Sequence, residues 1–265
     1  MTKSTKTAIF KKPRSTKSSF FRENIKYYLI VTGVSGTGKT ALIQTLSGEN
    51  PYIPHDERTN HPTRHQLFSD TLAFELIDMP GQEWHESIRI EELDRLKREH
   101  RENHMSIGVI NVVSNGYLEG PIGNYVIDPV VDDKVNHEYL KQARRTEMLQ
   151  IPEWTKRLFD DPPIADWLLT VVSKADLWWA PRAWRDIKFS YGNPKSDYFK
   201  LIGRNAQRFH RVIPFSAINH LFYDTVPMTG YYSDEQKEHD FISLQETIVQ
   251  LASKTLELLK RGNHG

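Results

Sequence analysis

The sequence predicts an α/β protein with a mostly parallel sheet covered by helices on both faces. Apolar runs of strand length alternate with helical patterns along the chain, which is typical of a doubly wound sheet. A glycine-rich segment, residues 33–40, joins the first predicted strand to the first predicted helix. The 265 residues, 38% hydrophobic and 26% charged, fit one large soluble domain or one domain with insertions. No apolar run is long enough to cross a bilayer.

The first elements follow from local patterns. Residues 27–32 are a continuous apolar run, which predicts a buried parallel strand, and residues 41–47 predict a helix. A polar loop at 49–64 leads to two short strands, at 65–68 and 72–77. Because only a tight turn separates these two strands, we expect an antiparallel hairpin.

The middle of the chain alternates in the same way. Residues 83–103 predict a charged, exposed helix, and residues 106–113 predict a buried parallel strand. We expect an ordered insertion at 116–135, whose shape the pattern does not define. Residues 136–160 have a helical pattern. Either a continuous helix or one interrupted near Pro152 is compatible with it.

The last third completes the alternation. Residues 166–173 predict a strand, a helical insertion runs to about His210, and residues 211–215 predict a last short strand. Residues 233–261 predict an amphipathic helix. Its expected apolar face consists of Phe241, Leu244, Ile248, Leu251, Thr255 and Leu258.

Charge and cysteine content limit the possible functions. Residues 1–25 are rich in lysine and arginine, with Glu23 as their only acid, and we expect a basic, disordered tail. A contact of this tail with an anionic membrane or nucleic acid, or a role as a transit peptide, remains an alternative. The net charge of +1 gives no general attraction to either partner. The absence of cysteine excludes disulfides and thiolate chemistry, and with no apolar leader it favours a cytoplasmic location.

The glycine-rich segment fits G-x-x-x-x-G-K-[ST] at every fixed position. Its glycines would let backbone N–H groups surround a phosphate beside a helix N-terminus. Lys39 would contact the β- and γ-phosphates, and the Thr40 hydroxyl would ligate Mg²⁺. The predicted phosphate site comprises Gly33, Val34, Ser35, Gly36, Thr37, Gly38, Lys39, Thr40 and Ala41.

A second motif follows the strand at 72–77 and fits D-x-x-G followed by glutamine. Asp78, at the end of this strand, would hold Mg²⁺ through water. The backbone N–H of Gly81 can approach a γ-phosphate because no side chain intervenes. Gln82 could then orient a water in line with that phosphate.

Two further motifs predict recognition of a base. Residues 173–176 have the sequence Ser-Lys-Ala-Asp, similar to the guanine motif [NT]-K-x-D, with Ser173 in place of Asn or Thr. The Asp176 carboxylate can accept hydrogen bonds from N1–H and the exocyclic amine of guanine, neither of which adenine offers. The stem of Lys174 could lie over the base, and a backbone N–H at Ser216-Ala217 could donate to guanine O6. The predicted base site comprises Ser173, Lys174, Asp176, Leu177, Ser216 and Ala217.

These four motifs, in this order, resemble the Ras-like GTPases, a class that includes Ras, Arf and the translation GTPases. The resemblance covers residues 27–217 and implies a three-layer P-loop NTPase fold with a mixed, mostly parallel six-stranded sheet of Ras-like order. It implies one GTPase domain at 26–262, with insertions at about 116–160 and 180–210. The implied activity is Mg²⁺-dependent binding of GTP and GDP, with slow hydrolysis of GTP and a nucleotide-dependent switch.

The resemblance also assigns roles to single residues. Gln82, Lys39 and a switch threonine would act in hydrolysis, and Thr40, Asp78 and the same threonine would surround Mg²⁺. Thr59 is preferred as this threonine by its spacing to Asp78, and Thr63 is the alternative.

Three functions remain open at this point. A hydrolysing switch is favoured by Gln82, and a GTP-binding scaffold with little hydrolysis is the alternative. An ATP-dependent kinase or ATPase is disfavoured by residues 173–176. Asp78 and Asp176 lie farther apart than in a minimal Ras-like domain, so we expect the insertions and the switch regions to contact a protein effector or regulator.

Overall fold

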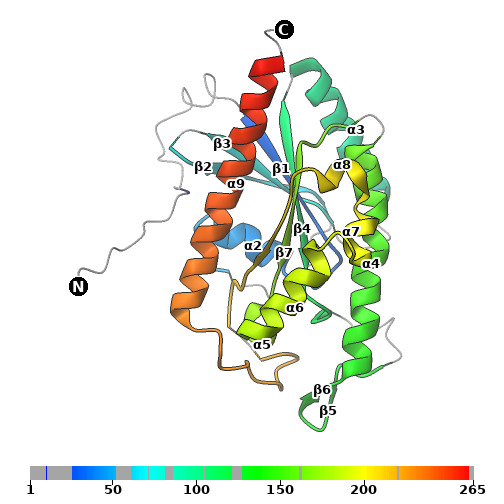
Figure 1. The fold of residues 1–265 in the computed structure, drawn as a ribbon, viewed down its shortest axis with the longest axis vertical. Coiled ribbons are helices and arrows are strands. Elements are labelled where there is room, and N and C mark those ends of the chain that lie inside the picture. Colours follow the sequence, from blue (N-terminus) through cyan, green and yellow to red (C-terminus); the bar gives the residue numbers. More distant parts are fainter. Residues whose placement is uncertain are drawn as a thin grey trace, which may run out of the picture.

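The fold is an α/β sandwich in which helices cover both faces of one mixed sheet (Figure 1). The computed structural model describes residues 10, 26–51, 61–70, 72–80, 86–103, 105–120, 127–160, 163–219 and 221–262.

The central sheet has six strands in the order β2-β3-β1-β4-β7-β8. The β2 strand runs antiparallel to β3, and every other neighbouring pair is parallel. This confirms the predicted mixed, mostly parallel sheet of Ras-like order. The strands are β1 (Lys26–Thr32), β2 (Thr63–Phe68), β3 (Ala73–Asp78), β4 (Ser106–Val113), β7 (Trp167–Val172) and β8 (His210–Pro214).

The helices agree closely with the predicted ones. They are α2 (Lys39–Leu46), α3 (Glu86–Asn103), α4 (His137–Phe159), α5 (Ala175–Trp178), α6 (Pro181–Gly192), α7 (Asp197–Leu201), α8 (Gly203–Gln207) and α9 (Asp234–Gly262). The α4 helix continues through Pro152, so the interruption left open there does not occur. Ile151 and Trp154, on either side of this proline, are buried in the core, and this packing keeps the segment helical.

Alternating side chains of the strands divide the core into two layers. Leu29 of β1 packs with residues of α2 and α9 on one face of the sheet, whereas Ile30 packs with residues of α3 and α4 on the other. Figure 1 shows α9 crossing one face and the α3, α4 and α6 helices covering the other. Burial on both faces explains why β1, β4 and β7 are continuous apolar runs rather than alternating ones.

The insertion at 116–135 contains a small hairpin within its described part. Its strands are β5 (Val130–Val131) and β6 (Lys134–Val135), at the end of the molecule next to the start of α4 (Figure 1). Asp132 and Asp133 form the turn with φ angles of 49° and 55°. Two left-handed residues in a row are typical of a two-residue hairpin turn, and aspartate tolerates this conformation better than most side chains.

Two residues depart from the sequence-based expectations. Phe10, within the expected solvated tail, is buried and packs edge-on against Phe74 of β3, with ring centroids 5.6 Å apart. The rest of residues 1–25 lies outside the described residues. Leu258, expected on the apolar face of α9, is 41% exposed, whereas Thr255 is buried. The apolar face of α9 therefore ends one turn earlier than its pattern indicates.

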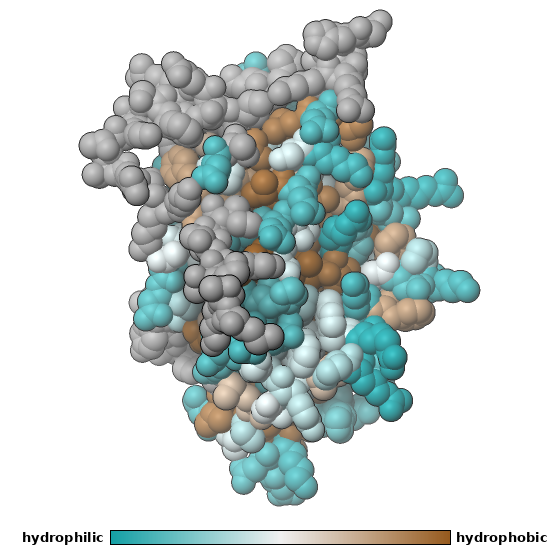
Figure 2. Space-filling model, turned by 60° about the vertical axis from the view of Figure 1, so that its left-hand side comes forward, coloured by the Kyte–Doolittle hydropathy of each residue, from teal (hydrophilic) through white to brown (hydrophobic). Residues whose placement is uncertain are grey.

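The visible surface is mostly hydrophilic. Figure 2 shows small hydrophobic areas between polar and charged side chains on the face in view. Large exposed apolar side chains among the described residues lie on several separate elements, such as Leu149 of α4, Phe189 of α6 and Tyr231 before α9. No helix in the described ranges is both long and apolar enough to cross a membrane.

Gly108 of β4 is required by its neighbour on β7. A Cβ atom at this position would overlap the indole ring of the fully buried Trp167, which lies directly across the two strands. We expect Gly108→Ala to lower the free energy of unfolding by about 1–3 kcal/mol, because neither the ring nor the strand can move without loss of packing. Urea denaturation measures this effect.

Gly120→Ala is the matched control. No atom of the described residues lies within 4 Å of a Cβ built at Gly120, so this variant should be as stable as the wild type. Equal stability of the two variants would show that the contact between Gly108 and Trp167 does not limit this position.

Candidate functional site

The glycine-rich segment, residues 33–40, forms a loop between β1 and α2, and we call it the phosphate loop. Gly33, Gly36 and Gly38 have φ angles of 136°, 82° and 87°, a region that other residues rarely adopt. A Cβ at Gly33 would overlap the carbonyl oxygen of Val112, and one at Gly36 would overlap that of Glu119. Glycine is therefore required at both positions to fit the loop against its neighbours.

Lys39, the first residue of α2, is buried beneath this loop. Its Nζ donates a hydrogen bond to the carbonyl oxygen of Val34 at 3.0 Å. Burial lowers the pKa of Lys39 to about 8, an effect that Asp78 opposes and Arg89 reinforces. A phosphate group in the loop would supply negative charge beside this cation and raise its pKa again. The site is therefore electrostatically prepared for an anion.

Two oxygen-bearing side chains that could ligate a metal ion meet next to the phosphate loop. The Thr40 hydroxyl donates to Oδ2 of Asp78 at 3.0 Å, and Asp78 is fully buried at the end of β3. A hydroxyl and a carboxylate are hard oxygen ligands of the kind that Mg²⁺ prefers, so these residues fit the predicted ion. The predicted switch residues Thr59, Gly81 and Gln82 lie outside the described residues.

The alternative switch threonine, Thr63, lies within the described residues. It is exposed at the start of β2, directly across the hairpin from Asp78. Its Oγ1 lies 3.3 Å from Nε2 of His65. The choice between Thr59 and Thr63 stays a prediction from the sequence.

Residues 173–177 follow β7 and run into the first turn of α5, and we call this segment the base loop. Ser173 connects it to the phosphate loop, because its hydroxyl oxygen lies 2.6 Å from the carbonyl oxygen of Thr37. The same hydroxyl lies 3.1 Å from the carbonyl oxygen of Val113 at the end of β4. The hydroxyl of Ser173 therefore ties this segment to the phosphate loop.

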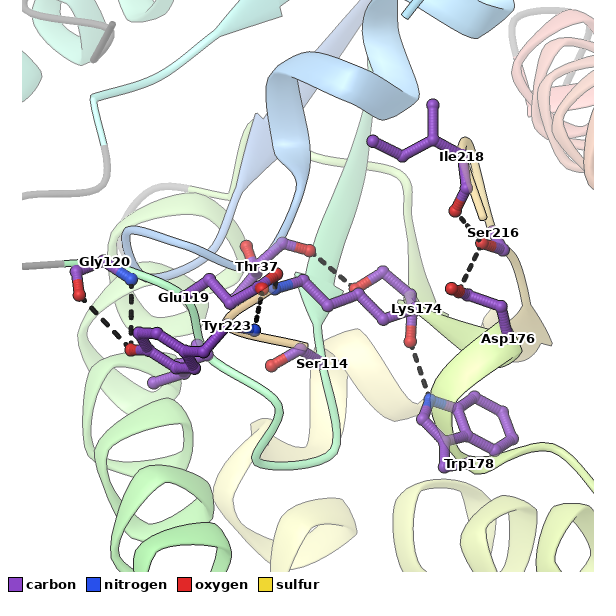
Figure 3. Close-up of polar contacts among 12 residues, drawn as sticks. Thr37, Ser114, Glu119, Gly120, Lys174, Asp176, Trp178, Ser216, Ile218 and Tyr223 are labelled. Atoms are coloured by element: carbon purple, nitrogen blue, oxygen red, sulfur yellow. Dashed lines mark hydrogen bonds and ion pairs between the residues drawn. The ribbon is translucent and has the colours of Figure 1, made fainter. Parts of the chain in front are cut away.

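Asp176 is fully buried in the base loop and is held by the segment after β8. The Ser216 hydroxyl donates to Oδ1 of Asp176 at 2.5 Å and lies 2.9 Å from the carbonyl oxygen of Ile218 (Figure 3). The backbone N–H of Thr229 donates to the carbonyl oxygen of Asp176 at 3.0 Å. These contacts fix the carboxylate and its peptide in one orientation.

Other predicted site residues have mainly packing roles in this structure. The side chains of Val34 and Leu177 are buried in one apolar cluster, which joins the phosphate loop to the base loop. Ala217 packs against the core on the α9 face. Trp178, which is not among the predicted site residues, donates from its indole Nε1 to the carbonyl oxygen of Ser173 at 2.8 Å and stacks on Trp184 of α6.

Glu119 is a site residue that the sequence motifs did not indicate. Its Oε2 accepts a hydrogen bond from Nζ of Lys174 at 2.6 Å, and its Oε1 accepts one from the backbone N–H of Tyr223 at 3.0 Å. The backbone N–H of Glu119 also donates to the carbonyl oxygen of Gly36, at 3.4 Å. A single glutamate within the insertion at 116–135 belongs to no spaced motif, so the sequence alone could not identify it.

The fold brings the predicted segments together at one edge of the sheet. These parts all lie at or just after the carboxyl ends of strands: the phosphate loop at β1, Asp78 at β3, the base loop at β7 and Ser216 at β8. Ligand sites of open α/β sheets form at this edge. The resulting site has a glycine-lined anion cradle at one end and a fixed buried carboxylate at the other.

Comparison with known proteins agrees with this geometry. Residues 28–150 match the family model described as 50S ribosome-binding GTPase. The matched range includes the phosphate loop and Asp78 and ends before Ser173. No curated protein matches the chain.

Solved structures also include similar chains. A crystal structure of Toc33 from Arabidopsis thaliana in complex with GDP and Mg²⁺ is 15% identical, with a TM-score of 0.46, and the match covers 89% of this chain and 88% of that one. A dimerization-deficient mutant of Toc33 is 14% identical, with a TM-score of 0.42 and coverage of 89% and 87%. At these TM-scores the likenesses carry no conclusion about function.

The lowered pKa of Lys39 has a measurable consequence for stability. The folded protein releases this proton near pH 8, whereas the unfolded chain keeps it to about pH 10.5. Between these values the unfolded state binds more protons, so stability rises with pH. We expect the unfolding free energy of the nucleotide-free wild type to gain on the order of 3 kcal/mol over Lys39→Met across this window.

Urea denaturation of both proteins at several pH values measures the difference, in which all other titrating groups cancel. Parallel curves for wild type and Lys39→Met would contradict the burial of a charged Lys39.

Proposed function

We propose that this chain, which carries a P-loop GTPase domain, binds GTP and GDP together with Mg²⁺, hydrolyses GTP slowly and acts as a nucleotide-dependent switch. One observation carries the proposal. The hydrogen bond from Ser173 to the carbonyl oxygen of Thr37 makes the anion cradle and the Asp176 loop parts of one rigid unit. A ligand with phosphates at one end and a guanine base at the other suits such a unit.

The phosphate loop would bind the α-, β- and γ-phosphates. Its glycines leave the backbone N–H groups accessible, and the N-terminus of α2 adds partial positive charge. Lys39 lies under the loop, and its Nζ donates to the carbonyl oxygen of Val34. Its ammonium group would move its hydrogen bonds to the β- and γ-phosphate oxygens.

Thr40 and Asp78 would hold Mg²⁺, Thr40 directly and Asp78 through water. Bound there, the ion supplies positive charge next to the β- and γ-phosphate oxygens. The mutual hydrogen bond of these two side chains keeps both oxygens at one place on the sheet edge. They are thus oriented before the ion arrives, which lowers the cost of ordering them.

Asp176 would select guanine over adenine. Its carboxylate can accept two hydrogen bonds from guanine N1–H and the exocyclic amine, and Ser216 fixes its orientation. The backbone of Ser216 and Ala217 would donate to guanine O6. Because the carboxylate is buried, an unmatched base leaves it without these bonds, and this penalty gives the selectivity.

Hydrolysis and switching are assigned to residues identified from the sequence. Gln82 would orient the attacking water, and Gly81 and Thr59 would contact the γ-phosphate only in the GTP state. Loss of these contacts on hydrolysis would release the two segments. The insertions at 116–160 and 180–210 are the proposed place of contact for an effector or regulator.

Two measurements test the proposed function. The first is competition of GTP, GDP and ATP for the Mg²⁺-loaded protein, in which GTP and GDP should compete strongly and ATP weakly. Equal binding of ATP would refute the assignment of the base loop. The second is single-turnover hydrolysis of GTP. Tight binding without turnover would refute the hydrolysing switch and favour the alternative function, a GTP-binding scaffold.

Asp176→Asn should change the base preference. We expect weaker GTP and GDP binding by a few kcal/mol, because two charge-assisted hydrogen bonds are lost. Xanthine nucleotides should gain affinity, since the amide can donate to the xanthine carbonyl that replaces the guanine amine. Calorimetry with GDP and XDP measures both changes. Asp197→Asn, on the exposed face of α7, is the control and should bind GDP like the wild type.

Gln82→Leu should separate binding from hydrolysis. Leucine has a similar volume but cannot orient water, so we expect unchanged affinity for GTP and a turnover at least roughly tenfold lower. Phosphate release under single-turnover conditions measures the rate. Gln66→Leu, an exposed position on β2, should retain wild-type turnover. A Gln82 variant that hydrolyses GTP at the wild-type rate would remove this residue from the mechanism.

A further inference from the structure

A buried ion pair joins the first insertion to the base loop. Nζ of Lys174 lies 2.6 Å from Oε2 of Glu119, and the two side chains are only 10% and 13% exposed. Glu119 belongs to the segment that follows β4, whereas Lys174 follows β7. Ion pairs removed from water in this way are strongly sensitive to the loss of either partner, because the remaining charge stays buried alone.

The carboxylate of Glu119 is held on its other side by the segment after β8. Its Oε1 accepts from the backbone N–H of Tyr223, and the Tyr223 hydroxyl exchanges hydrogen bonds with the backbone of Gly120 at 3.2 and 3.4 Å (Figure 3). The Glu119 backbone N–H also donates to Gly36 of the phosphate loop. Glu119 therefore contacts the phosphate loop, the base loop and the segment after β8 at once.

The segment that carries Glu119, residues 114–120, is held at its start by a side chain of α4. The Glu147 carboxylate, fully inside the protein, accepts from the hydroxyl of Ser114 at 2.7 Å and from the backbone N–H groups of Ser114 and Gly116 at 2.5 and 3.1 Å. Farther along, the Tyr139 hydroxyl donates to the carbonyl oxygen of Leu118 at 2.8 Å. These hydrogen bonds fix the backbone of residues 114–120 and thereby the position of Glu119.

We propose that Glu119 is a positioning residue of the base loop: its carboxylate holds the Lys174 ammonium group in place, keeps the stem of Lys174 over the base and so slows the release of a guanine nucleotide. The inference rests on the proposed function. Lys174 has a left-handed backbone, with φ of 54°, so its side chain leaves the loop in a direction that few backbone conformations allow. Glu119 is the acidic partner that meets it there.

The electrostatics of Lys174 support this role. Burial lowers the pKa of Lys174, and the charge and hydrogen bond of Glu119 act in the opposite direction. Without the carboxylate, the ammonium group would gain by moving toward water, because an unpaired buried cation is costly. The stem would then leave the base, and the nucleotide would dissociate faster.

Four variants of the full chain test the proposal. Glu119→Gln removes the charge at nearly constant shape, Lys174→Met removes the ammonium and keeps the stem length, and a third protein carries both changes. Glu138→Gln is the matched control, since Glu138 is in the same insertion but pairs with Lys141 on the exposed surface. The dissociation rate of a fluorescent GDP analogue is measured for each protein by displacement with excess GDP.

We expect Glu119→Gln and Lys174→Met each to speed dissociation roughly tenfold, the effect of losing one charge-assisted hydrogen bond. The double variant should release GDP no faster than the faster single variant, because both changes break the same interaction. Glu138→Gln should match the wild type. A merely structural role of Glu119 would instead give additive effects in the double variant.

Three outcomes count against the proposal. A wild-type rate for Glu119→Gln would overturn it, and so would additive effects in the double variant. If Glu119→Gln does not fold, a comparison of Lys174→Met with the double variant decides, because the double variant leaves no unpaired charge. Different release rates for these two proteins would then overturn the inference. A wild-type protein that binds no guanine nucleotide would refute the proposed function itself. The release rates of the variants test only the role of Glu119.

Discussion

The hydrogen bond from the Ser173 hydroxyl to the Thr37 carbonyl oxygen is the contact on which the site depends. It is possible only because β1, β4 and β7 are parallel neighbours, so that the loops after them emerge at the same edge. The second acceptor of this hydroxyl, the carbonyl oxygen of Val113, ends the strand between the two loops. Sheet order, loop position and site geometry are therefore consequences of one arrangement, and a change in any strand pair would separate the two ends of the site.

Burial of charge is the second principle of this site. Lys39, Lys174 and Asp176 are all buried, which costs free energy and is tolerable only with defined partners. Lys39 donates to a backbone carbonyl oxygen, whereas Lys174 donates to a carboxylate, and burial lowers the pKa of both lysines. The ammonium group at the phosphate loop thus has a neutral partner, and the one at the base loop has a charged partner.

Most of the fold could be predicted because its signals are local. The buried strands are continuous apolar runs, and the phosphate loop is defined by glycines at fixed spacing. The errors concern contacts between distant segments. Phe10 gave no periodic signal, yet it packs against Phe74. The interruption left open at Pro152 could not be decided from the sequence, because packing of the neighbouring side chains keeps the segment helical. Glu119 and Glu147 act through partners far along the chain, and no pattern in one sequence can reveal such pairs.

The position of β4 in the sheet has a consequence for folding during synthesis on the ribosome. All eight residues of β4 are buried, but its second neighbour, β7, follows only after the whole first insertion has been made. At ribosomal speed the stretch between Val113 and Trp167 takes on the order of several seconds. During that time the apolar edge of β4 has no strand beside it and can pair with other chains. The length of the insertion thus sets how long the nascent chain must be shielded.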